Sequence, residues 1–353
     1  MTNATSTAII KKLLLLFLLV AGLYFAKRFL VPLSIAAVLA TLFLPLCSWL
    51  EQKRVPRWAA ALTCLILLFL AASFIGAMLG WQIAELANDI VQIKLRTLHL
   101  FDRFQQFIFS HFNISLQEQT QIIKNQQNFI ASILSRVAGS LSSALMSFIL
   151  TVVYVFLLLY YRSHIKDFIL QLTSPAHREE TRQVIYRAAH VSQQYLLGLS
   201  KMILCLWIMY GISFSLLGIK NAIFFAILCG LLEIVPFIGN LTGVTITVLV
   251  AVVHGAELSL LVGVGGAYGA VQLIQGWILE PLILGPQVKI NPLFTILALV
   301  VGELIWGIPG IVLAIPLTAI LKIVCDHIDS LKPYGFLMGE IKQARKIKLF
   351  FKK

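Results

Sequence analysis

Long apolar runs separated by short polar segments extend along most of the chain. A transmembrane helix needs about 20 predominantly apolar residues. Runs of 13 to 27 residues lie at 13–26, 29–50, 58–84, 141–161, 196–217, 222–239, 241–253 and 258–279. The pattern predicts an all-α fold, namely a polytopic integral membrane protein with about eight transmembrane helices.

The last apolar stretch, residues 292–324, is too long for one ordinary span. It contains helix-breaking residues at Gly302, Gly307, Pro309, Gly310 and Pro316. Such residues are tolerated at membrane depth where protein or water surrounds the backbone. We therefore expect a broken or re-entrant hairpin near the C-terminus.

Two polar segments interrupt the series of spans. Residues 85–140 are rich in Gln, Asn and Ser, with Phe and Ile at helical spacing, which predicts an amphipathic arm outside the hydrocarbon. This arm is either a subunit contact or lid, or a solvated hairpin lying on the membrane surface. The basic amphipathic segment 162–195 suits a cytoplasmic interface.

These features divide the chain into six parts. The predicted parts are transmembrane helices 1–3 (1–84), an extracytoplasmic helical arm (85–140), helix 4 (141–161), a cytoplasmic basic connector (162–195), a transmembrane core with broken helices (196–330) and a basic cytoplasmic tail (331–353).

Composition supports a membrane location. Hydrophobic residues make up 59% of the chain and charged residues only 12%, whereas soluble domains carry about 25% charged residues. The net charge of +13 is concentrated between apolar runs, which favours contact with anionic membrane lipids over nucleic acid. The Lys and Arg bias of short loops predicts that both termini are cytoplasmic.

No catalytic or metal-binding motif is found in the sequence. Phosphate-binding loops, H-E-x-x-H and G-x-S-x-G are all absent, and the seven histidines never take the i, i+4 spacing of a helical metal pair. We therefore expect a protein that is not an enzyme, with no cofactor and no metal.

Polar and helix-breaking residues inside the apolar runs are the candidate functional residues, because unpaired polar groups are costly in hydrocarbon. In the first cluster, Glu233 precedes Pro236, Gly239 and Asn240. Pro236 has no N–H, so the helical ladder should open near Leu232 and Glu233. Freed carbonyls and a carboxylate could then bind a cation or a hydroxylated solute. The alternative is a kinked helix with Glu233 at an aqueous edge.

Two further clusters follow. An irregular segment after residue 281 is either cavity-lining backbone or an ordinary cytoplasmic loop, and Glu303 either faces the same cavity as Glu233 or marks an exposed hairpin tip. The candidate pathway residues in these clusters are Gln272, Gln275, Glu280, Pro281, Asn291, Pro292, Glu303, Gly307, Pro309 and Gly310.

The order of these motifs resembles the autoinducer-2 exporter family of bacterial membrane transporters. The resemblance rests on E-x-x-P-F-I-G at 233–239, Glu280-Pro281, Asn291-Pro-Leu, and G-x-P-G-x-x-x-A-x-P-L at 307–317, and it covers essentially the whole chain. One departure is that Gln275 and Trp277 stand where relatives usually carry an acidic residue and an asparagine.

The resemblance implies a homo-oligomer of the bacterial cytoplasmic (inner) membrane that moves a small molecule, such as autoinducer-2, or an ion without ATP. The expected function is therefore secondary transport or export, with ion coupling through Glu233, Glu280 or Glu303 if it is present. The alternatives are a passive channel, or a membrane scaffold that acts through the 85–140 arm.

Overall fold

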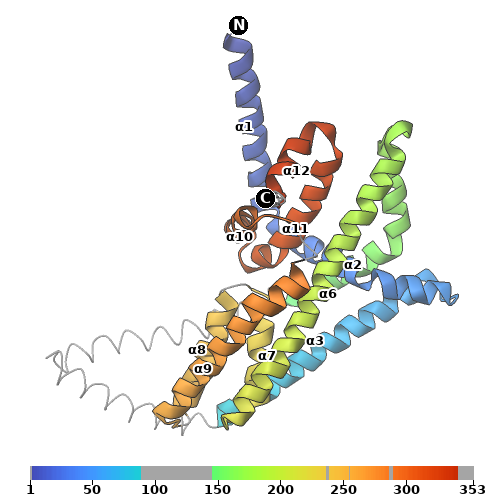
Figure 1. Cartoon of the computed structure of the whole chain (residues 1–353). Coiled ribbons are helices and arrows are strands. Elements are labelled where there is room, and N and C mark those ends of the chain that lie inside the picture. The colour runs from blue at the N-terminus through green and yellow to red at the C-terminus, as the bar shows by residue number, and fades with distance from the viewer. Residues whose placement is uncertain (1, 89–144, 236–237, 254, 286–288, 341–353) are drawn as a thin grey trace, which may run out of the picture. The chain divides into compact units, whose positions relative to one another are not determined.

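The computed structural model describes residues 2–88, 145–235, 238–253, 255–285 and 289–340. Within these ranges the chain is almost entirely helical and forms no strand (Figure 1). The predicted 85–140 arm falls almost wholly outside the described residues, as do Pro236 and most of the basic tail. The all-α prediction is confirmed.

Helices lie at each of the predicted apolar runs, although several begin or end at other residues. The first group is α1 (Thr2–Phe25), α2 (Lys27–Gln52), α3 (Arg57–Asn88) and the helix Leu145–Leu172. The second group is a short 3-10 turn η1 (Pro175–His177), α6 (Arg178–Leu216), α7 (Ala222–Leu232), α8 (Ile238–Val253), α9 (Leu258–Ile274) and η2 (Gln275–Leu284). The last is α10 (Pro292–Trp306), α11 (Ile308–His327), the 3-10 turn η3 (Asp329–Leu331) and α12 (Lys332–Met338).

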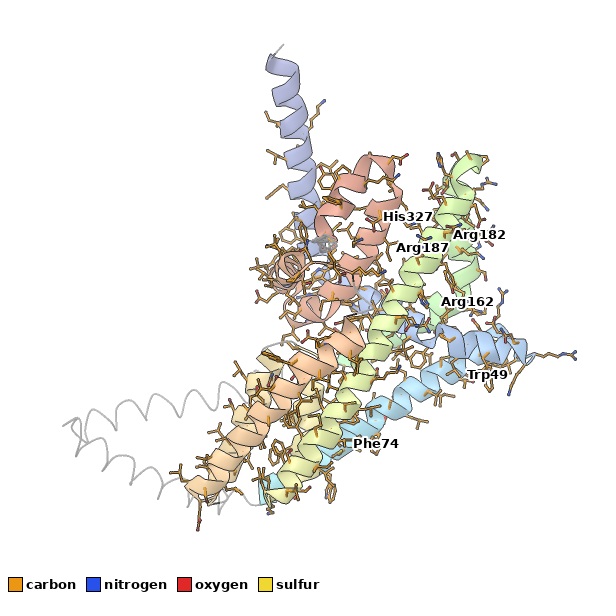
Figure 2. All side chains as sticks on the ribbon, viewed as in Figure 1. Trp49, Phe74, Arg162, Arg182, Arg187 and His327 are labelled. Atoms are coloured by element: carbon orange, nitrogen blue, oxygen red, sulfur yellow. The ribbon has the colours of Figure 1, made fainter. Side chains whose placement is uncertain are left out.

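Six helices of the described chain are long and apolar enough to cross a bilayer. They carry large apolar side chains on their outer surfaces, such as Leu216 and Trp277, 84% and 82% exposed, and Phe74, 68% exposed and labelled in Figure 2. A surface of this kind is stable in lipid and would associate in water. The structure thus confirms a multi-pass membrane protein.

The chain forms two compact units. Unit 1 contains residues 1–58, 155–201 and 279–353, and unit 2 contains residues 59–154 and 202–278. Each unit is assembled from segments far apart in the sequence.

In unit 2, α7 and α8 form a tight helical hairpin (Figure 1). A Cβ atom at Gly239 would collide with the backbone of Leu232, and one at Gly243 would lie 3.0 Å from the Sγ of Cys229. Glycine at these two positions of α8 therefore lets the two backbones approach closely.

The predicted spans at 222–239 and 241–253 need correction. The helix that begins at Ala222 already ends at Leu232, and Gly239 belongs to the next helix, α8. At a rise of 1.5 Å per residue, α7 and α8 are about 16 and 24 Å long, against a hydrocarbon core of about 30 Å. Each is too short to span the core alone.

The segment around Pro281 is also more regular than predicted. Residues Gln275–Leu284 continue α9 as a π-helix, and Gly285 N–H donates to the Glu280 carbonyl at 3.0 Å. Hydrogen bonds from residue i+5 to residue i widen the helix, and this wider turn accommodates the proline ring. The prediction that Leu282, Ile283 and Leu284 are irregular is therefore wrong, because these residues are helical.

In unit 1, α10 and α11 form the hairpin predicted near the C-terminus. The chain reverses at Gly307, whose φ of 66° favours glycine. A Cβ atom at Gly302 would lie 2.5 Å from the Gly310 carbonyl oxygen, so both glycines permit close packing of the two helices. With only 15 residues, α10 is about 22 Å long, which favours the re-entrant form of the hairpin.

Polar contacts fix the other helices of unit 1. Trp306 Nε1 donates to the Leu23 carbonyl at 3.0 Å, which ties α10 to α1. Arg187 on α6 lies beside His327 at the end of α11 (Figure 2), and 3.0 Å separates Arg187 Nη1 from His327 Nε2.

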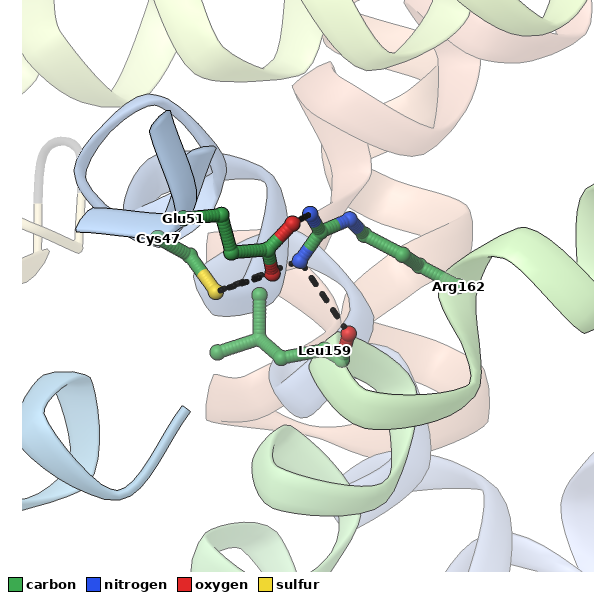
Figure 3. A network of polar contacts seen from close by, with 4 residues as sticks. All are labelled: Cys47, Glu51, Leu159 and Arg162. Carbon is green, nitrogen blue, oxygen red and sulfur yellow. Dashed lines mark hydrogen bonds and ion pairs between the residues drawn. The ribbon is translucent and has the colours of Figure 1, made fainter. Parts of the chain in front are cut away.

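An ion pair joins α2 to the helix Leu145–Leu172 (Figure 3). Arg162 Nη2 lies 2.5 Å from Glu51 Oε2, and Nη1 donates to Cys47 Sγ at 3.2 Å and to the Leu159 carbonyl at 3.4 Å. The two charged side chains are only 20–23% exposed. Each charged group of this cluster therefore has both a charge partner and hydrogen bonds, which offset the desolvation of the two side chains.

Candidate functional site

A chain of polar side chains crosses the apolar interior of unit 2. Gln275 Nε2 donates to Glu233 Oε1 at 2.8 Å, and Gln272 Nε2 donates to Gln275 Oε1 at 3.2 Å and to the Tyr210 hydroxyl at 3.0 Å. Glu233, Gln275 and Tyr210 are 7%, 6% and 1% exposed. The contacts link a buried carboxylate to two amides and a phenol.

Two tyrosines extend this chain toward α8. The Tyr210 ring stacks on the Tyr268 ring at a centroid distance of 6.3 Å, and the Tyr268 hydroxyl donates to Asn240 Oδ1. We call Tyr210, Glu233, Asn240, Tyr268, Gln272 and Gln275 the polar network. Its residues come from α6, the end of α7, α8, α9 and the first residue of the π-helix.

The spacing of residues along α9 explains how three of these side chains meet. Tyr268, Gln272 and Gln275 stand at i, i+4 and i+7, which places them on one face of a helix. The opposite side of this segment is apolar and exposed, with Leu273 at 63% and Trp277 at 82%. The polar residues therefore face the protein and the apolar residues face outward.

The helix break at Glu233 is confirmed, but its backbone is used differently from the prediction. α7 ends at Leu232, and the Leu232 carbonyl accepts a hydrogen bond from Val235 N–H at 2.9 Å. This carbonyl therefore already has a donor. Glu233 is buried within the chain, so the prediction that it lies at an aqueous edge is wrong. Side chains, and not freed backbone carbonyls, supply most of the polar groups at this site.

The structure brings together four predicted site residues: Glu233, Asn240, Gln272 and Gln275. Gly239 lies beside them as the point of close backbone contact with Leu232. Pro236 lies outside the described residues. The remaining predicted residues, Glu280, Pro281, Asn291, Pro292, Glu303, Gly307, Pro309 and Gly310, belong to unit 1.

Several of these unit 1 residues have structural roles. Asn291 caps α10, since its side chain accepts from Phe294 N–H at 2.9 Å and donates to the carbonyls of Leu337 and Gly339. Glu303 is exposed one turn before Gly307, as the hairpin-tip alternative predicted. Pro292 and Pro309 occupy the first turns of α10 and α11, where a missing N–H costs little.

Tyr210 and Tyr268 were not among the site residues predicted from the sequence. The i, i+4, i+7 spacing with Gln272 and Gln275 would have revealed Tyr268. Tyr210 is a single tyrosine in an apolar run and gives no local signal. Within the described part of the chain, no group of three or more His, Cys, Asp or Glu side chains is placed to hold a metal ion.

Helices long enough to span a bilayer and a buried polar network in an apolar interior define a polytopic membrane protein with an internal polar site. The sequence model of the family described as AI-2E family transporter matches residues 13–330 of this chain. The chain therefore belongs to the AI-2E transporter family and is a membrane transport protein.

Related proteins cover nearly the full chain at low identity. YrrI of Bacillus subtilis strain 168, whose name describes a candidate transport protein, is 24% identical over 318 residues, which are 85% of this chain and 87% of YrrI. The AI-2 transport protein TqsA of Escherichia coli K12 is 25% identical over 334 residues, which are 93% of this chain and 94% of TqsA.

Proposed function

We propose that this chain is a secondary transporter that exports a small hydroxylated solute such as autoinducer-2 without ATP. We further propose that the polar network binds the solute or a coupling cation. The buried carboxylate of Glu233, held by Gln275 at 2.8 Å, is the observation that carries this proposal. A carboxylate in an apolar membrane interior is costly, and such groups mark substrate or ion pathways.

The chemistry of the network fits a hydroxylated solute. Carboxylate and amide oxygens accept hydrogen bonds, and amide nitrogens and phenols donate them, so hydroxyl groups can be bound as both donors and acceptors. The stacked rings of Tyr210 and Tyr268 add an apolar surface against which a small ring could pack. The TqsA name supports autoinducer-2 as the first solute to test.

The short helices of unit 2 support a carrier mechanism. α7 and α8 meet at a break beside Glu233, and carriers commonly place their binding sites where helices are interrupted at membrane depth. We propose that solute binding alters the packing of this hairpin. Cytoplasmic termini, an inner-membrane location and assembly into a homo-oligomer belong to the same proposal.

The decisive experiment measures flux in proteoliposomes. Vesicles containing the purified chain are loaded with autoinducer-2, and efflux is followed with and without imposed sodium or proton gradients. We expect saturable efflux that Glu233→Gln reduces by at least about tenfold, equivalent to about 1.4 kcal/mol. Glu257→Gln is the matched control, because Glu257 is an exposed carboxylate at the N-cap of α9 in the same unit.

Each alternative function predicts a different result. Unchanged efflux in Glu233→Gln would remove Glu233 from the mechanism. Single-channel conductance in a planar bilayer would indicate a passive channel. Absence of flux for every solute and gradient tested would favour the scaffold hypothesis.

A further inference from the structure

A pocket in unit 1 lies outside the polar network. Its volume is about 460 Å³, and it is lined by Arg57, Trp58, Tyr160, Tyr161 and His164. Arg57 and Trp58 begin α3, whereas the other three residues lie on one face of the helix Leu145–Leu172. The lining thus combines three amphipathic aromatic rings, a guanidinium and an imidazole.

The aromatic residues of this pocket are typical of a membrane–water interface. Trp58 begins one apolar run, and Tyr160 and Tyr161 end another. Trp and Tyr concentrate where hydrocarbon meets headgroups, because their rings are apolar and their N–H or O–H groups reach water. Leu157, one turn before these tyrosines and 40% exposed, continues the same face toward the hydrocarbon.

The charge of the pocket is basic. No acidic residue lines it, and within the described residues neither Arg57 nor His164 has an ion-pair partner. This differs from Arg162, whose guanidinium is engaged by Glu51. Arg57 therefore has its fork of N–H donors available for an oxyanion, and a guanidinium matches a phosphate group well.

We propose that this pocket binds the phosphodiester headgroup of an anionic phospholipid. Arg57 contacts the phosphate, His164 adds a second polar contact, and the aromatic rings hold the glycerol region at interface depth. The acyl chains continue along the exposed apolar face that includes Leu157. This site is independent of the solute site in unit 2, so loss of lipid binding does not test the proposed transport mechanism.

Native mass spectrometry of the full chain tests the site. The purified protein is titrated in detergent with phosphatidylglycerol or phosphatidylcholine carrying the same acyl chains. We expect phosphatidylglycerol to bind more tightly than phosphatidylcholine. Arg57→Gln should weaken the binding of phosphatidylglycerol about fivefold, which is the effect of one basic residue at a lipid surface. Arg54→Gln removes the same charge from the same basic turn outside the pocket, and we expect a change below about twofold.

Two further measurements make the result decisive. His164→Gln should also weaken phosphatidylglycerol binding, and melting temperatures of all variants in detergent show whether they remain folded. Equal losses in Arg57→Gln and Arg54→Gln would overturn the proposal, because general surface charge would then explain the binding. Arg57-dependent binding of soluble glycerol phosphate as tight as that of phosphatidylglycerol would also overturn it, because the acyl chains would then contribute nothing and a soluble phosphate ester would be the ligand.

Discussion

The pair formed by Glu51 and Arg162 gives a quantitative test of packing in unit 1. Two unit charges about 4 Å apart attract by about 4 kcal/mol at an effective dielectric constant of 20. Partial burial of both side chains, each about one-fifth exposed, offsets much of this attraction through desolvation. We expect a net coupling free energy of about 1–2 kcal/mol.

A double-mutant cycle measures this coupling. Glu51→Gln and Arg162→Met should each lower the free energy of unfolding by about 1–3 kcal/mol, because each leaves a partly buried charge without its partner. The double variant should lose less than the sum of the two, by the coupling free energy. Equilibrium unfolding of the full chain in mixed micelles with increasing SDS, followed by circular dichroism, provides the measurement.

An exposed ion pair serves as the matched control. Arg182 Nε lies 3.7 Å from Glu179 Oε2 on α6, and these side chains are 61% and 71% exposed. Glu179→Gln should therefore change stability by less than about 0.5 kcal/mol. If the Glu51 and Arg162 substitutions are additive to within about 0.5 kcal/mol, the ion pair does not stabilise unit 1.

Three further predictions concern the C-terminal part of unit 1. Gly302→Ala should lower stability by about 1–3 kcal/mol, because its Cβ would lie 2.5 Å from the Gly310 carbonyl oxygen. Asn291→Ala should cost about 1–2 kcal/mol through loss of the α10 cap; SDS unfolding measures both. Lys332 donates a hydrogen bond to Asp329 and adds its positive charge, which lowers the pKa of Asp329 below its usual 3.8. This contact stabilises the fold above that usual pKa and is lost as the pH falls through the lowered value, so Lys332→Met should raise the Asp329 titration midpoint measured by carbon NMR.

The corresponding controls separate local packing from general effects. Gly265→Ala should be neutral or slightly stabilising, because a Cβ atom there would meet nothing within 4 Å and alanine favours the helix. If Gly265→Ala lowered stability as much as Gly302→Ala, close packing at Gly302 would not explain the loss. Retention of full stability by Asn291→Ala would show that the cap is dispensable, and an unchanged Asp329 midpoint in Lys332→Met would assign its lowered pKa to another cause.

Part of the candidate site was predictable because its signals are local. Glu233, three residues before a proline, and Gln272 and Gln275 within an apolar run stand out as polar residues in segments that otherwise favour lipid. Asn291 and Glu303 gave the same kind of signal. The structure uses Asn291 as a helix cap and leaves Glu303 exposed at a hairpin tip. Residue type alone does not distinguish these roles.

The position of the helix ends was less predictable than the existence of the helices. The apolar run from Ala222 continues beyond Leu232, yet α7 ends there because the chain turns and packs α8 against it through Gly239 and Gly243. The π-helix around Pro281 similarly depends on a hydrogen-bond register that composition does not specify.

The apolar runs of the sequence are enough to predict a polytopic α-helical membrane protein. The reason is local, because each spanning helix satisfies its own backbone hydrogen bonds and needs only a sufficiently long apolar run. Which polar residues share a site depends instead on the packing of the helices. The contacts of Tyr268 with Asn240, Gln275 with Glu233 and Gln272 with Tyr210 join residues 28, 42 and 62 positions apart. Such contacts depend on how the helices of unit 2 pack, and no local pattern encodes that packing.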